Sequence, residues 1–321
     1  MSGIAKISGF SMGRNATKLY YPVKESIQSI LPIVSEFYFA LGDSDADDRT
    51  REEIESIDSD KIKIIDTKWD TDKYRRNTEL AHQTDIAKAR CSGDWLIYLQ
   101  SDEVIHERDL SLISDACNRY LHQKDVDAFL FKYYHFWGDY DHYHISHGWY
   151  KREIRVVRND PDIHSWKDAQ SFRRIPDFDG LNYSTRENTF KLNVIELDAM
   201  IYHYGWVRPP RLMKTKGTVM NTFYHGSAKA NQMDKNVPSE FDYGPLNRLA
   251  RFSETHPAVM GEWINKMDWR DQLQYSGSAN PLREKHKHEK FKYRLITLLE
   301  QLFYGGNEIG GFKNYNKVRG L

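Results

Sequence analysis

The sequence predicts an α/β fold in which a mostly parallel central sheet carries helices on both faces. Apolar runs of strand length alternate with segments of helical spacing over residues 4–134 of the 321-residue chain. The strongest of these runs, residues 95–99, is apolar throughout and follows a tight Gly93-Asp94 step, which is typical of a strand buried on both faces. This alternation predicts a doubly wound arrangement.

Each expected strand is a short apolar or alternating run that is bounded by loop-forming residues. The first helix begins at Pro22, a residue suited to a first helical turn, and ends before Pro32. Further helices are expected over residues 51–55, 72–90 and 110–121. The expected strands cover residues 4–10, 36–41, 61–65, 95–99, 127–134, 153–158 and 192–202.

Composition excludes several classes of protein. Lys plus Arg and Asp plus Glu number 46 each, so no global positive field attracts nucleic acid. No apolar run approaches the ~20 residues that a membrane span needs, and the first residues lack the apolar stretch of a signal peptide, so a cytoplasmic protein is expected. Two cysteines, Cys91 and Cys117, are too few for a disulfide framework or a zinc site of their own.

An aromatic tract occupies residues 133–150, with eight aromatic residues and four histidines within 18 positions. Rings with polar tips suit the wall of a pocket that takes a sugar, whose apolar face can lie on a ring. A zinc site is disfavoured here because the tract has no cysteine and no helical His-x-x-x-His pair. A structured aromatic loop is the simpler alternative.

Two acids, Asp102 and Glu103, follow the buried strand at residues 95–99. Ligands of open α/β sheets bind beyond the carboxyl ends of the strands, where two acids suit a divalent cation that holds phosphate oxygens. The alternative is a solvated acidic turn. Residues 95–103 resemble the strand and Asp-x-Asp-like metal motif of family 2 glycosyltransferases, which have the Rossmann-like GT-A fold. Gln100 stands where that motif has its first acid, and Ser101 follows it.

The resemblance extends over residues 6–210 and implies a site for a nucleotide sugar. Family members place a polar pair after the first strand, an acidic loop after the second, and polar residues on the helix that precedes the metal strand. For the acidic loop, a capped helix start is an equally good interpretation. The implied nucleotide contacts in this chain are Arg14, Asn15, Asp43, Asp45, Gln83 and Ser101.

The resemblance also implies a base and a cation. In inverting members an acid beyond the metal strand takes the proton of the acceptor, and Asp168, beside Trp166 on the acceptor side, fits that place. Asp160 and Asp162 are alternatives that have their own explanation as turn residues. His203 would complete a site for Mn²⁺ or Mg²⁺ with Asp102 and Glu103. Arg208 or Arg211 would neutralise the leaving diphosphate.

The chain is expected to divide into a nucleotide-sugar-binding catalytic domain, residues 1–217, and a mainly helical extension, residues 218–321. Apolar residues recur at helical spacing over 291–302 and stop at Gly305-Gly306, a suitable C-terminal cap. This stripe most simply packs on the catalytic domain. Five basic residues crowd its start, so contact with the inner membrane surface is the alternative.

These features together predict a glycosyltransferase of the hexosyltransferase class, in polysaccharide or glycoconjugate synthesis. It would move a sugar from a nucleotide diphosphate sugar, with UDP favoured, to a hydroxyl of a glycan or lipid-linked acceptor, with metal assistance and inversion. A nucleotidyltransferase and a non-catalytic glycan-binding protein remain as alternatives. A nucleotidyltransferase would need a phosphate loop with more glycine and basic residues than Ser11-Met12-Gly13-Arg14. A glycan-binding protein would explain why the metal motif lacks its first acid.

Overall fold

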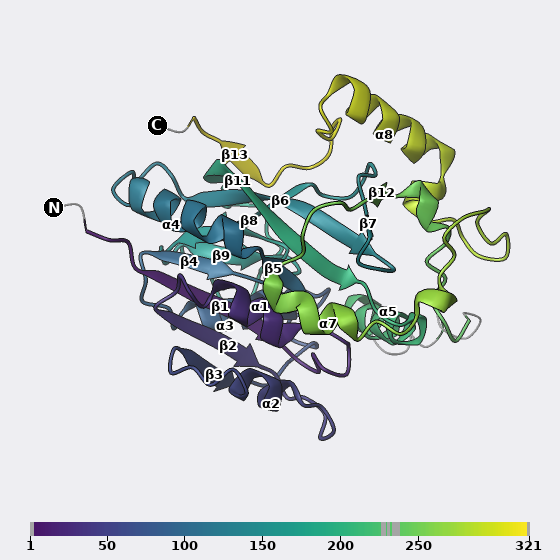
Figure 1. Cartoon of the computed structure of the whole chain (residues 1–321). Helices are drawn as coiled ribbons and strands as arrows, with labels where there is room; N and C mark the ends of the chain where they lie inside the picture. The colour runs from purple at the N-terminus through teal and green to yellow at the C-terminus, as the bar shows by residue number, and fades with distance from the viewer. Residues whose placement is uncertain (1–2, 226–228, 230–231, 233–237, 320–321) are drawn as a thin grey trace.

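The computed structural model describes residues 3–225, 229, 232 and 238–319. Four parallel strands form one half of the central sheet, in the spatial order β3, β2, β1, β4 (Figure 1). They are β3 (Ile62–Asp66), β2 (Glu36–Leu41), β1 (Ile7–Gly13) and β4 (Trp95–Tyr98). This half confirms the predicted α/β fold, and it brings the carboxyl ends of these strands to one edge.

The other half of the sheet corrects the prediction of a mostly parallel arrangement. Strand β8 (Arg152–Arg158) runs antiparallel to β4, and β6 (Ala128–Trp137) runs antiparallel to β8. A parallel return needs a crossover, usually a helix, whereas the described residues between β6 and β8 form only turns and β7 (His142–Tyr143). The sheet is therefore mixed.

The longest strand, β11 (Leu192–Trp206), continues past the predicted end at residue 202. It pairs in parallel with β6 and antiparallel with β5 (Glu103–Ile105), so His203 lies opposite both His135 and Glu103. Its start pairs with β13 (Tyr315–Lys317), and β12 (Ala250–Arg251) extends the far side through β7. A separate hairpin is formed by β9 (Ile163–Trp166) and β10 (Ser171–Arg174).

Helices cover both faces of the sheet, as predicted. Apolar residues of α1 (Val23–Ile30), α2 (Thr50–Glu55) and α4 (Leu110–Arg119) pack on one face, and those of α3 (Thr78–Lys88) pack on the other. Helix α3 begins six residues later than expected from residue 72. Asn77 precedes it in the left-handed region, with φ of 67°.

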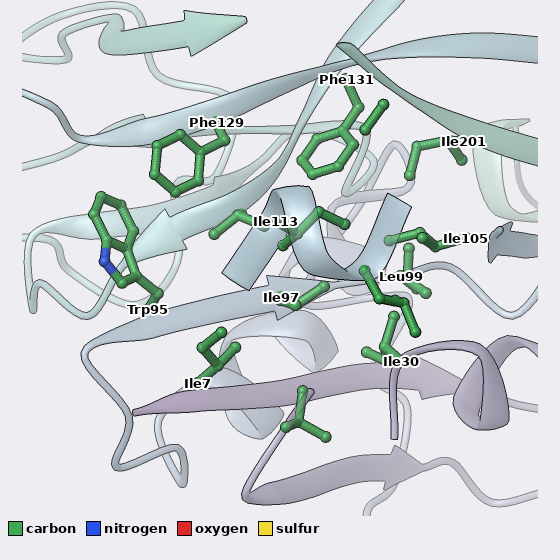
Figure 2. Packing of buried hydrophobic residues seen from close by; sticks show 14 of the residues in the cluster. Ile7, Ile30, Trp95, Ile97, Leu99, Ile105, Ile113, Phe129, Phe131 and Ile201 are labelled. Atoms are coloured by element: carbon green, nitrogen blue, oxygen red, sulfur yellow. The ribbon is translucent and has the colours of Figure 1, made fainter. Parts of the chain in front are cut away.

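The run at residues 95–99 is fully buried, and its side chains pack in the hydrophobic clusters on both faces of the sheet. Trp95, Ile97 and Leu99 join the cluster shown in Figure 2, whereas Leu96 and Tyr98 point to the opposite face. Alternate residues of a strand point to opposite faces, so the absence of polar residues from this run follows from two-sided burial. Each large apolar side chain buried there contributes about 1.5–3 kcal/mol.

The C-terminal third contains α5 (Pro210–His225), α7 (Gly261–Asn265) and α8 (Phe291–Phe303). The predicted boundary at residues 217 and 218 lies within α5. Much of the remainder consists of loops, and β12 and β13 return to the main sheet. The 3-10 turns of the described chain are η1 (Glu107–Asp109), η2 (Leu246–Arg248), η3 (Ala258–Met260), η4 (Arg270–Gln272) and η5 (Lys287–Glu289).

Helix α8 ends where predicted, at Gly305 and Gly306, which both have positive φ. It is held by its polar side to the loop between β7 and β8, because buried Glu300 pairs with Lys151 and His147. The apolar stripe that was expected to pack on the catalytic domain is largely exposed instead. Among the described residues, no helix has both the length and the apolar character to span a bilayer.

Candidate functional site

The loops after β1 and β2 meet at the carboxyl edge of the parallel strands. Arg14 Nε lies 3.6 Å from Asp43 Oδ1, and the backbone N–H of Trp69 donates to the same oxygen at 3.1 Å. The side-chain oxygen of Asn15 accepts from the backbone N–H of Asp45 at 2.8 Å. The structure thus brings the predicted polar pair and the acidic loop together.

Trp69 was not predicted, yet its indole packs against both loops, beside Gly42 and Arg14. A Cβ added at Gly42 would lie 2.4 Å from Trp69 Nε1, so only glycine allows the ring to rest there. The Arg14 guanidinium lies 5.9 Å from the ring centroid. Trp69 Nε1 and Gln83 Oε1 are buried, and neither has a hydrogen-bond partner among the described residues. Buried polar atoms are rarely left unpaired, so these two atoms indicate a place for ligand groups.

Three other predicted nucleotide contacts are engaged within the protein. The Asp45 carboxylate accepts from Lys18 Nζ at 2.7 Å, and hydrogen bonds from Lys18 and Asn15 lower the pKa of Asp45. The amide of fully buried Gln83 donates to Glu79 at 2.7 Å. The hydroxyl of Ser101 donates to a backbone carbonyl of β1 at 3.2 Å. Asp43 is therefore the acid of this loop with the most capacity for a ligand.

The two adjacent acids after β4 are directed to different environments. Glu103 is fully buried and receives two hydrogen bonds from the Arg155 guanidinium, at 2.6 and 2.7 Å. The Tyr133 hydroxyl and the backbone N–H of Gln100 donate to it as well, at 2.9 and 3.1 Å. These donors occupy both carboxylate oxygens. Glu103 therefore has no free oxygen with which to bind a cation at this edge.

Asp102 faces an imidazole and a lysine side chain. His203 Nε2 lies 3.7 Å and Lys216 Nζ 3.5 Å from Asp102 Oδ2. Although burial would raise the pKa of Asp102, His203 and Lys216 hold it below its usual range. Burial and the nearby Arg208 lower the pKa of Lys216 to about 7. Lys216, on α5, was not among the predicted site residues.

His135 fixes the orientation of His203. His135 Nε2 lies 2.7 Å from the backbone carbonyl oxygen of Tyr150, which can only accept, so Nε2 carries the proton. Burial and His203 hold the pKa of His135 well below its ordinary value, so the ring is neutral and Nδ1 accepts from His203 Nδ1–H at 2.9 Å. His203 therefore presents Nε2 toward Asp102. Metal-binding histidines are commonly oriented in this way through their second nitrogen.

The residues around Asp102 fit a divalent cation in part. Asp102 Oδ2 and His203 Nε2 supply a carboxylate and an imidazole, and a Cβ at Gly205 would lie 2.5 Å from each atom, so glycine keeps this cradle open. The described part of the chain contains no group of three or more His, Cys, Asp or Glu that could hold a metal. Mg²⁺ sites often use one or two carboxylates together with substrate phosphates and water.

Arg208 is buried and committed to the fold. Its guanidinium donates to the backbone carbonyls of Leu19 and of Gly205, the latter at 3.0 Å, and lies 4.7 Å from the ring centroid of Tyr21. Lys216 is thus the more direct cation beside Asp102. The positive charge of Arg208 also helps to lower the pKa of Asp102.

Asp168 lies on a strained turn between β9 and β10. Lys167 and Ala169, on either side of it, both have φ of 59°. Residues other than glycine rarely adopt this left-handed backbone conformation. Such strain often accompanies functional sites. The Tyr224 hydroxyl of α5 donates to Asp168 Oδ2 at 2.6 Å. The alternative acid Asp160 pairs with Arg174 at 2.8 Å, as a structural turn residue does.

A cavity of about 540 Å³ opens beside Asp168. Trp166, Phe312 and Tyr315 supply aromatic walls, and Glu153 lies at its side. Glu153 Oε1 accepts from the side chain of Gln170, whereas buried Oε2 has no hydrogen-bond partner in the described chain. Burial raises the pKa of Glu153 to about 7. Rings beside polar groups suit a sugar or polyol.

Helix α5 links this cavity to Trp69 and Asp102 at the sheet edge. Phe223 packs on Trp69, with ring centroids 5.5 Å apart, and the next residue, Tyr224, contacts Asp168. Two turns earlier, Lys216 contacts Asp102. The Gln100 side chain also donates to the backbone carbonyl of Ala169 at 3.3 Å. Trp69, Asp102 and the cavity beside Asp168 are therefore neighbours along one helix.

Neither a family model nor a curated protein matches the sequence. Among solved structures, S. aureus TarS 1-349 with UDP-GlcNAc is 14% identical, with a TM-score of 0.37 over 71% of this chain and 70% of that chain. The mannosyltransferase PcManGT of Pyrobaculum calidifontis, with GDP-Man and Mn²⁺, is 16% identical, with a TM-score of 0.30 over 40% and 35%. Glucosyl-3-phosphoglycerate synthase of Mycobacterium tuberculosis, with Mn²⁺, UDP and phosphoglyceric acid, is 16% identical, with a TM-score of 0.29 over 41% and 43%. At such TM-scores the likeness assigns no ligand, cation or residue role in this chain.

Proposed function

We propose that this chain is a glycosyltransferase that moves a sugar from a nucleotide diphosphate sugar to an acceptor hydroxyl. One observation carries the proposal. Asp102, His203 and Lys216 converge at the carboxyl edge of the parallel strands, between the unpaired buried polar atoms of Trp69 and Gln83 and a cavity lined by an acid on a strained turn. A donor with a flat base, a diphosphate and a sugar matches this succession of environments.

The donor would lie along the sheet edge. Asp43 would accept hydrogen bonds from the base, and Trp69 and Arg14 would enclose it. The diphosphate would then reach Lys216, whose positive charge favours the departing phosphates. Asp102 and His203 would hold Mn²⁺ or Mg²⁺ there, which would supply Lewis-acid stabilisation of the leaving group. UDP-sugars remain the favoured donors.

Asp168 would act as the general base. It would accept the proton of the acceptor hydroxyl while that oxygen attacks the anomeric carbon and the bond to the diphosphate breaks. Tyr224 donates to Asp168 Oδ2 and would keep the carboxylate oriented. Inversion would follow from attack on the face opposite the leaving group. A glycan or lipid-linked acceptor would occupy the cavity along Trp166 and Phe312.

The test begins with donor binding. UDP-, GDP- and dTDP-sugars are screened for thermal stabilisation with and without Mn²⁺, since a ligand that binds only the folded state raises its stability. Transfer is then measured as release of nucleoside diphosphate with candidate acceptors. Asp168→Asn should keep donor binding and lose about 10²–10⁴-fold in transfer, the usual share of a general base. Asp162→Asn, on a nearby turn, is the matched control and should remain active.

Two outcomes would replace the proposal. Release of pyrophosphate from a nucleoside triphosphate would favour a nucleotidyltransferase. Binding of a glycan without turnover of any nucleotide sugar, together with an unaffected Asp102→Ala variant, would favour a binding protein.

A further inference from the structure

One face of α8 is apolar and lacks a partner within the described chain. Phe291, Leu295, Leu298 and Leu302 follow one another at helical spacing, and Phe303 adjoins them. Phe291 is 77% exposed, Phe303 72% and Leu302 66%, unusually high values for residues of this kind. Figure 1 shows the helix standing outside the sheet. We call these five residues the apolar face of α8.

Unpaired positive charge lies beside the apolar face. The acids within α8 and in the segment just before it are already engaged, since Glu284 pairs with Lys290, Glu289 with Arg283, and Glu300 with Lys151. The basic residues that keep no carboxylate partner within the described chain are Lys285, Lys287, Lys292 and Arg294. We call these four residues the basic cluster.

We propose that α8 docks on an anionic phospholipid surface. A helix with an exposed apolar face and neighbouring lysines lies in the plane of a membrane, with its apolar side chains at the boundary of headgroups and acyl chains. Each lysine or arginine near such a surface adds attraction to anionic lipid. Both the apolar face and the basic cluster find a partner in this arrangement.

The same charges disfavour a second copy of the chain as the occupant. The one carboxylate of α8, Glu300, is buried beneath the helix and pairs with Lys151 and His147. A second α8 would therefore bring another basic cluster and no exposed acid of its own to offset it. An anionic bilayer neutralises the cluster while it also covers the apolar face.

Docking would place the membrane beside the cavity that contains Asp168. The segment that follows α8 contributes Asn307, Glu308, Phe312 and Lys313 to the cavity wall. An acceptor anchored in the same membrane could then reach Asp168. This consequence rests on the proposed function, whereas docking itself does not.

The test is sedimentation with vesicles. The full chain should sediment with phosphatidylcholine vesicles that contain about 30% phosphatidylglycerol, sediment less with phosphatidylcholine alone, and bind less as salt is raised. Leu298→Ser combined with Leu302→Ser should weaken partitioning about tenfold or more. Lys292→Gln combined with Arg294→Gln should weaken it on anionic vesicles and reduce its salt dependence.

The matched control is Leu112→Ser combined with Leu181→Ser, which removes exposed leucines elsewhere on the surface and should leave sedimentation unchanged. Circular dichroism checks that each variant is folded. The proposal is overturned if the wild-type chain ignores anionic vesicles at low salt, or if both leucine pairs behave alike. A dimer in solution that Leu298→Ser and Leu302→Ser dissociate would also overturn it. The sedimentation assay contains no nucleotide sugar. A chain that does not bind vesicles would therefore leave the proposed transfer reaction untouched.

Discussion

At the scale of single residues, neighbours in sequence have separate tasks. Asp102 faces Lys216 and His203 at the sheet edge, whereas Glu103 enters the core and pairs with Arg155. Successive residues at the start of a strand point to opposite sides, so an acid pair that looks like one motif is divided by the pleat.

Replacing Glu103 tests this division. Glu103→Gln leaves the buried Arg155 guanidinium without its counter-ion, so the free energy of unfolding should fall by about 3–5 kcal/mol, as measured by urea denaturation. Asp198→Asn, which breaks an exposed pair with Lys132, is the matched control and should cost at most about 1 kcal/mol. A Glu103→Gln variant of normal stability that had lost affinity for Mn²⁺ would instead assign Glu103 to the cation.

Glu153 predicts a pH dependence of stability. Its pKa is raised from 4.5 to about 7 by burial, so the folded chain keeps a proton that the unfolded chain releases in this window. Its contribution to the free energy of unfolding should therefore decline from about pH 4.5 upward and level off above about pH 7.

The comparison with Glu153→Gln isolates this effect. The stability of the variant relative to wild type should rise by about 3 kcal/mol over that window, as measured by urea denaturation at each pH. Glu284→Gln should shift with the opposite sign, because a hydrogen bond from Lys290 lowers the pKa of Glu284. A difference between Glu153→Gln and wild type that is constant with pH would contradict the burial argument.

At the scale of elements, α5 decides the form of the site. It follows β11 directly, and its side chains contact three separate segments of the chain through Lys216, Phe223 and Tyr224. Periodicity alone does not reveal such contacts, because polar and aromatic residues on one helix also suit a solvated face.

Ligand-dependent hydrogen exchange tests the position of α5. A nucleotide sugar bound beneath α5 should slow the exchange of its backbone amides, because ordering by a ligand suppresses local opening. Amides of α4, whose apolar residues pack in the core of the sheet, should be unaffected. Protection of the loop around Asp43 without any change in α5 would place the nucleotide outside the cover of this helix.

At the scale of the whole molecule, two kinds of pairing build one sheet. The all-parallel half carries the loop at Asp43, and the mixed half brings His135 beside His203 through the parallel register of β6 and β11. The aromatic tract was expected to line a pocket, but much of it forms β6 and packs in the core, as buried Phe136 and Trp137 do. The cavity takes its rings chiefly from other segments, among them Trp166 and Phe312.

The sequence by itself determined several local features of the fold. The strand at residues 95–99, the helix that ends before Pro32 and the cap at Gly305 all depend on local patterns of burial, backbone restriction and turn chemistry, and the structure reproduces each of them. Such patterns are local, so they can be recognised without knowing what the segment packs against.

Only the tertiary structure decided which polar residues meet. Lys216 lies 114 positions from Asp102, and Arg155 lies 52 from Glu103, so no spacing in the sequence relates them. The exposure of the apolar stripe of α8 likewise could not be predicted from the sequence. An amphipathic pattern shows that one face of a helix is apolar but not what covers that face. Contacts between distant segments depend on how the sheet closes, and this depends on strand register and direction.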